Sequence, residues 1–110
     1  MSDLQHHPDG RLRHLLTLET LPAATIERLL DRAEALRGHA HGGTGKRQAL
    51  AGRAMCTLFF EASTRTRCSF QLAGQRLGMD VLNFDAGTSS AKKGETDLDT
   101  LRTLEAMGVH

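Results

Sequence analysis

Two arginines stand close together in the stretch FFEASTRTRCSF, residues 59–70, directly after a serine and a threonine. The hydroxyls of Ser63 and Thr64 and the guanidinium groups of Arg65 and Arg67 can all hydrogen-bond to an anion. The stretch lies where a strand is expected to give way to a helix, so several backbone N–H groups there lack partners. Together these donors predict a binding site for a phosphate-sized anion.

The helix dipole favours this interpretation over a purely structural one. A cation in the first turn of a helix costs about 0.3–1 kcal/mol against the dipole, and a bound anion would offset that cost. The alternative is that Ser63 is an ordinary helix cap and that both arginines are solvated.

A second polar cluster is the loop SSAKKGE, residues 89–95, which follows an expected strand. It combines two hydroxyls, two lysines and a glycine. Loops of this kind can close over an anionic substrate and exclude water. A solubilising surface loop is the alternative interpretation.

The histidines and cysteines do not suggest a further site. His39 and His41 have no neighbouring cysteines or carboxylates at zinc-binding spacing, so no metal site is predicted. Cys56 and Cys68 are the two cysteines, and their number and setting do not suggest a secreted disulfide framework. Both are expected to be reduced. Cys68 lacks a clear base partner, so a packing role is expected for it.

The elements that must position these residues follow from the periodicity of the apolar residues. A helix is predicted over 21–37, a strand over 53–60, a helix over 65–77, a strand over 80–85, and a last helix from its cap at Thr96 to Gly108. This order predicts an α/β fold, a partial open parallel sheet with flanking helices. Val109 would be the first residue of a third strand, so we expect the opening portion of a larger protein.

Composition sets the broad class. The chain has 110 residues, 39% of them hydrophobic and 25% charged, which is typical of a globular domain. Its net charge of +1 implies no bulk attraction to nucleic acid or to a membrane surface. No apolar stretch approaches the ~20 residues of a membrane span, and the start lacks the apolar core of a signal peptide. The cytoplasm is therefore the expected compartment.

Read together, FFEASTRTRCSF, RLG, KKGET and DT resemble the N-terminal part of the catalytic chain of aspartate transcarbamoylases. The resemblance runs from about Leu15 to the last residue. Phe60-Glu61 before Ala62 and the Lys-Lys-Gly-Glu-Thr loop favour the aspartate over the ornithine enzymes. The polar segment 1–14 is expected to be a flexible N-terminal arm, and the resemblance implies that 15–110 is the N-terminal portion of a carbamoyl phosphate domain with the aspartate domain absent.

The resemblance also implies a reaction. The carbamoyl group of carbamoyl phosphate passes to the α-amino group of L-aspartate, giving N-carbamoyl-L-aspartate and phosphate for pyrimidine (UMP) biosynthesis, without a metal or organic cofactor. The family forms homotrimers with shared active sites, which in some members join regulatory or dihydroorotase-like chains. The 110-residue chain alone is expected to be inactive.

In the resemblance, four residues of the arginine-rich stretch hold the phosphate: Ser63, Thr64, Arg65 and Thr66. Arg65 would also neutralise charge growing on the leaving phosphate. Thr66 would also reach the carbonyl oxygen and help to polarise it.

The loop would complete the site from the neighbouring subunit. Ser90 would contact carbamoyl phosphate, although Ser89 lies near the same place and the choice between them stays open. Lys93 would act in catalysis and contact the anionic groups of both substrates.

Three further residues would support the site between domains or subunits. Glu61 would pair with arginines of the aspartate domain, Glu95 would support the phosphate-binding arginine across the subunit boundary, and Arg67 would be mainly structural. Two alternatives remain: a transcarbamoylase with ornithine or another acceptor, and a non-catalytic paralogue that serves only in assembly.

Overall fold

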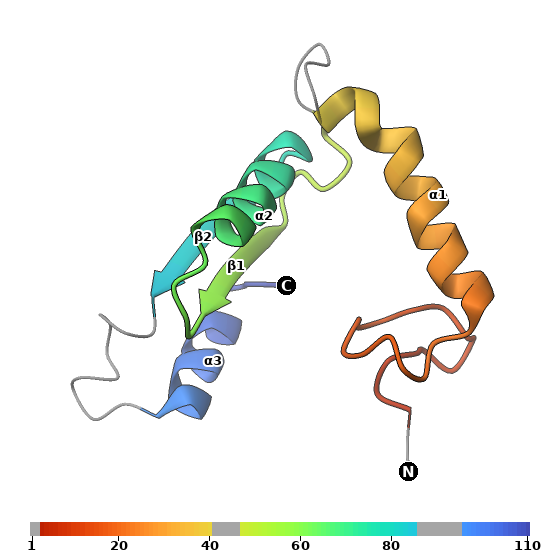
Figure 1. The fold of residues 1–110 in the computed structure, drawn as a ribbon. Helices are drawn as coiled ribbons and strands as arrows, with labels where there is room; N and C mark the ends of the chain where they lie inside the picture. The colour runs from red at the N-terminus through yellow and green to blue at the C-terminus, as the bar shows by residue number, and fades with distance from the viewer. Residues whose placement is uncertain (1–2, 41–46, 86–95) are drawn as a thin grey trace. The chain divides into compact units, whose positions relative to one another are not determined.

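The helix–strand–helix–strand–helix order expected from the sequence is present in the computed structural model, which describes residues 3–40, 47–85 and 96–110 (Figure 1). The chain divides into two units, Met1–Arg37 and Gly38–His110. The elements are α1 (Ala23–Ala40), β1 (Ala54–Phe59), α2 (Thr64–Arg76), β2 (Asp80–Asp85) and α3 (Asp97–Ala106). The predicted bounds agree to within a few residues, except that α1 continues through Gly38, where its exit was expected.

The first unit is organised around one buried amide side chain. Gln5 is only 4% exposed, and its Oε1 accepts hydrogen bonds from the backbone N–H groups of Leu16 (2.6 Å) and Thr17 (3.0 Å). Its Nε2 donates to the Thr20 hydroxyl at 3.2 Å. The Gln5 amide thus satisfies backbone groups of Leu16 and Thr17 that would otherwise lack partners.

The second unit contains a two-stranded parallel sheet. β1 and β2 pair in register from Ala54↔Asp80 to Phe59↔Asp85. Thr57 is buried, and its hydroxyl donates to Asn83 Oδ1 across the strands at 2.6 Å. This confirms the predicted parallel α/β arrangement.

Val109 lies beside β1 on the side away from β2, where it was predicted to begin a third strand. Val109 forms a parallel bridge with Ala54, and the His110 N–H donates to the Ala54 carbonyl at 3.0 Å. The order across the sheet is therefore β2, β1, Val109.

The two helices of this unit cover opposite faces of the sheet. Gly74 of α2 is buried against Met55 and Val81, which share one face. A hollow of ≈ 260 Å³ on the other face is lined by Cys56 and Leu82 from the sheet and by residues of α3. Because side chains alternate along a strand, these contacts place α2 and α3 on different faces.

The N-terminus of α3 carries the predicted Thr96 cap, and the cap gives a testable prediction. The Asp99 N–H donates to the Thr96 hydroxyl at 3.1 Å, and the Thr96 N–H donates to Asp99 Oδ2 at 3.2 Å, a reciprocal capping box. Thr96→Ala is expected to reduce the stability of α3 by about 1 kcal/mol, as measured by amide hydrogen exchange. Thr103→Ala is the matched control, because the Thr103 hydroxyl donates only back to the Asp99 carbonyl. Equal losses in both variants would contradict a specific role for the cap.

The same cap predicts a pH dependence. Hydrogen bonding to the Thr96 side chain, and secondly to its backbone, lowers the pKa of Asp99 below 3.8. The ionised carboxylate therefore stabilises α3 at pH values above 3.8, and this contribution is lost as the pH falls through the lowered pKa. The dependence should weaken in Thr96→Ala.

Candidate functional site

The candidate site is the turn that joins β1 to α2. Ser63 is the N-cap residue of α2, with φ −142° and ψ 73°, and its carbonyl accepts the Arg67 N–H at 3.0 Å. The backbone N–H groups of Thr64, Arg65 and Thr66 precede this bond and so have no acceptor within the helix. The turn therefore presents successive donors at the C-terminal end of a parallel strand.

No side chain of the described residues neutralises this helix end. The Ser63 hydroxyl makes no capping hydrogen bond, and the first turn of α2 has no acidic residue. Arg65 is exposed, and its guanidinium has no hydrogen-bond or ion-pair partner within 3–40, 47–85 and 96–110. This geometry disfavours the alternative in which Ser63 is an ordinary side-chain cap.

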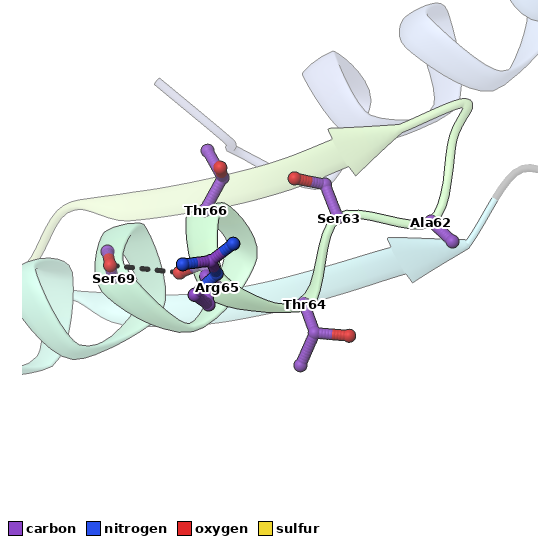
Figure 2. A pocket seen from close by; sticks show the side chains of 6 residues that line it. All are labelled: Ala62, Ser63, Thr64, Arg65, Thr66 and Ser69. Atoms are coloured by element: carbon purple, nitrogen blue, oxygen red, sulfur yellow. Dashed lines mark hydrogen bonds between the residues drawn. The ribbon is translucent and has the colours of Figure 1, made fainter.

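The side chains at the start of α2 line an open hollow of ≈ 620 Å³ (Figure 2). It is lined by Ala62, Ser63, Thr64, Arg65, Thr66 and Ser69. Figure 2 shows the Ser63 and Thr64 side chains leaving the turn in opposite directions, with Arg65 and Thr66 on the first turn of the helix. The structure thus brings together all four residues that were predicted to hold a phosphate.

Ser69 also lines this hollow and was missed in the sequence. Its hydroxyl donates to the Arg65 carbonyl at 2.9 Å, so it fixes the first turn beside the arginine. The signal that could have identified it is spacing, because residues four apart on a helix lie on the same face.

Glu61 and Arg67 lie in a neighbouring hollow of ≈ 370 Å³. Phe59, Phe60 and Phe84 also line it, and Ser63 and Thr64 border both hollows. Arg67 is half-buried, whereas Arg65 is exposed. The two arginines therefore face different surroundings, as expected from positions two apart on a helix, which differ by about 200°.

The loop residues predicted to complete the site are Ser89, Ser90, Lys93 and Glu95. They lie outside the residues that the structure describes.

Sheet topology gives an independent reason to expect a ligand at this turn. The connection from β1 through α2 leads to one side of β1, and the connection through α3 leads to Val109 on the other side. The end of β1 is therefore a point where the strand order reverses. In open α/β sheets, ligands bind outside the carboxyl ends of the strands at such a point.

The remaining reactive groups do not form a second centre. Cys56 and Cys68 are free thiols, and burial raises the pKa of Cys56. Cys68 is exposed, so the packing role expected for it is wrong within this chain. In the described part of the chain, no three His, Cys, Asp or Glu side chains are grouped as metal ligands. None of its helices is long and apolar enough to span a membrane.

Comparison with known sequences places these features in a family. Residues 13–110 match the family model described as "Aspartate/ornithine carbamoyltransferase, carbamoyl-P binding domain". The chain is 68% identical over 109 residues to an aspartate carbamoyltransferase catalytic subunit of Xanthomonas campestris, and 68% identical over 110 residues to that of Stenotrophomonas maltophilia. Each alignment covers 99% of this chain and 35% of the relative, so the chain spans about a third of the length of these relatives.

Solved structures agree with the sequence matches. An aspartate transcarbamoylase from Trypanosoma cruzi in complex with carbamoyl phosphate has a TM-score of 0.69 at 44% identity, covering 80% of this chain and 28% of that one. The catalytic subunit of M. jannaschii aspartate transcarbamoylase has a TM-score of 0.71 at 32% identity, covering 88% of this chain and 32% of that one. The turn after β1 lies where the strand order reverses, and the family model covers residues 13–110. The chain therefore belongs to the aspartate/ornithine carbamoyltransferase family.

Proposed function

We propose that the chain supplies the phosphate-binding part of the active site of an aspartate carbamoyltransferase. Ser63, Thr64, Arg65 and Thr66 would hold the phosphate group of carbamoyl phosphate. The observation that supports this most directly is the first turn of α2, where backbone donors meet the Arg65 guanidinium, which has no partner among the described residues, and where there is neither an acidic residue nor a side-chain cap. An anion at this position would be stabilised by the helix dipole and by charge-assisted hydrogen bonds.

The proposed chemistry depends on positioning and electrostatics. The amine of L-aspartate attacks the carbonyl carbon of carbamoyl phosphate, and the C–O bond to phosphate breaks. Arg65 stabilises the negative charge that grows on the departing phosphate, and Thr66 polarises the carbonyl oxygen. The neutral amine must be held about 3–3.5 Å from the carbonyl carbon for this step.

Other parts of the proposed site come from outside the described residues. Ser90, or alternatively Ser89, would contact carbamoyl phosphate, and Lys93 would contact both substrates. Both would be supplied by a neighbouring subunit of a homotrimer. Glu95 would support Arg65 across the same boundary.

The proposal also covers the organisation of the chain. Residues 1–14 would form an arm, and 15–110 the N-terminal portion of the carbamoyl phosphate domain. Glu61 would pair with arginines of an aspartate domain, and Arg67 would support the structure around the second hollow. The protein would work in the cytoplasm. Because the 110-residue chain spans about a third of the length of its relatives, we expect that by itself it does not catalyse the reaction.

Calorimetric titration and an activity assay test the two parts of this proposal separately. Inorganic phosphate and phosphonoacetamide, a stable analogue of carbamoyl phosphate, should bind the chain with Kd in about the millimolar range. Acetamide, which lacks the phosphonate, is the matched control and should not bind. Carbamoyl aspartate formation by the isolated chain should equal background. Absence of anion binding would refute the phosphate site. Carbamoyl aspartate formation above background would refute the expectation that the isolated chain is inactive.

A further inference from the structure

Ser69 lines the ≈ 620 Å³ hollow, but its hydroxyl already has an acceptor. The hydroxyl donates to the Arg65 carbonyl at 2.9 Å, as Figure 2 shows. In the regular hydrogen-bond pattern of an α-helix, the same carbonyl also accepts the Ser69 N–H. The Arg65 carbonyl therefore accepts two hydrogen bonds from one residue, and together these hold the peptide unit to which it belongs.

That peptide unit carries one of the free donors of the turn. The Arg65 carbonyl and the Thr66 N–H lie in one rigid plane. The Ser63 carbonyl accepts the Arg67 N–H at 3.0 Å, and the Thr66 N–H, one position earlier, has no acceptor among the described residues. A hydrogen bond accepted by a carbonyl polarises the amide and strengthens its N–H as a donor. The Ser69 hydroxyl therefore acts on a donor that is available to an anion.

The start of α3 contains the same kind of bond above an amide that is already used. The Thr103 hydroxyl donates to the Asp99 carbonyl at 2.9 Å, again four residues back. The peptide unit of that carbonyl carries the Thr100 N–H, which donates to the Thr96 carbonyl at 3.0 Å. Of these two helices, α2 is therefore the one in which the polarised N–H is left, among the described residues, to bind a ligand.

We infer that Ser69 is a positioning residue for the anion, which acts through the Arg65–Thr66 peptide and does not contact the ligand itself. This role rests on the proposed function, because it requires an anion at the start of α2. Helical carbonyls point toward the C-terminus of the helix and N–H groups toward its N-terminus, so the Ser69 hydroxyl bonds the end of the peptide that faces away from the anion. One further bond strengthens the next one by about 10–30%, so the expected effect is modest.

A pair of variants at Ser69 tests this role in the full 110-residue chain. Ser69→Ala removes the hydroxyl, whereas Ser69→Thr keeps one that can donate to the carbonyl four residues back. Calorimetric titration with phosphonoacetamide should show binding weakened by about two- to fivefold in Ser69→Ala and unchanged in Ser69→Thr. Thr103→Ala is the matched control, since it removes the equivalent bond of α3, and it should leave the Kd unchanged.

Two further measurements separate positioning from a purely structural role. Alanine has a higher helix propensity than serine, and a serine bond to the carbonyl four residues back slightly destabilises a helix. Amide exchange in α2 should therefore be unchanged or slower in Ser69→Ala, although binding weakens. Without ligand, the carbonyl ¹³C resonance of Arg65 should move in Ser69→Ala and stay in place in Ser69→Thr, because the hydroxyl bond polarises that carbonyl.

Several results would overturn this role. Equal dissociation constants for Ser69→Ala and the unmutated chain would show that the peptide does not transmit the bond. Weaker binding together with faster exchange in α2 would identify a structural role, and a loss of more than about tenfold would identify a direct contact with the anion. Each of these leaves the phosphate site in place, because the unmutated chain still binds. If the unmutated chain binds no phosphonoacetamide, the phosphate site fails and the role of Ser69 fails with it.

Discussion

Arg65→Ala is expected to weaken the binding of phosphonoacetamide to the chain by about 10- to 100-fold. Hydrogen bonds to charged groups contribute about 1.5–3 kcal/mol each, and about 1.4 kcal/mol corresponds to a factor of ten in Kd. Arg65 lines the ≈ 620 Å³ hollow and has no competing partner in the described part of the chain, so its removal should affect the ligand directly. Calorimetry gives the two dissociation constants.

Two other arginines separate a specific contact from a general loss of charge. Arg53→Ala removes a positive charge beside the start of β1, far along the strand from the turn, and should leave the Kd unchanged. Arg67→Ala removes a charge from the neighbouring hollow and should have an effect between the other two. Equal weakening in all three variants would show that net charge, and not a contact from Arg65, governs binding.

Gly74→Ala is expected to destabilise the second unit by about 1–3 kcal/mol, through overpacking against the sheet. Glycine to alanine within a helix normally stabilises by about 0.5–1 kcal/mol, so the expected sign is the reverse of the usual one. A Cβ at Gly74 would overlap Met55 Sδ and would lie 3.0 Å from Val81 Cγ2. Amide exchange in β1 and α2 reports the change.

Gly38→Ala is the matched control for this substitution. Gly38 also lies within a helix, and apart from its chain neighbours and its own helix backbone a Cβ there would meet no atom of the described residues within 4 Å. The usual stabilisation of about 0.5–1 kcal/mol is therefore expected in α1. If both variants stabilise their helices, the close approach of α2 to the sheet is not as the structure describes it.

Local sequence signals were enough to predict the elements and the site-forming turn. Apolar periodicity identified the helices and strands, and Thr96 identified the start of α3. Ser63, Thr64, Arg65 and Arg67 were predicted as anion donors from their chemistry and their place at a strand-to-helix turn, whereas Thr66 was added only by the family resemblance. Each of these signals lies within a short segment, where neighbours in sequence are also neighbours in space.

Features that depend on distant contacts could not be predicted in the same way. Gln5 is a polar residue in a polar segment, and nothing near it in sequence indicates that it accepts hydrogen bonds from Leu16 and Thr17. Phe84, which lines the second hollow, comes from β2 and reaches the turn only through strand pairing. The place where the strand order reverses could likewise be located only from the bridge between Val109 and Ala54.

Amide chemical shifts of the ¹⁵N-labelled chain, followed during titration with phosphonoacetamide, locate the bound anion directly. We expect saturable shifts at the N–H groups of Thr64, Arg65 and Thr66, which precede the first bond of α2. The same shifts should be absent when acetamide is added. Saturable shifts confined to other parts of the chain, with these three amides unchanged, would contradict a phosphate site at the start of α2.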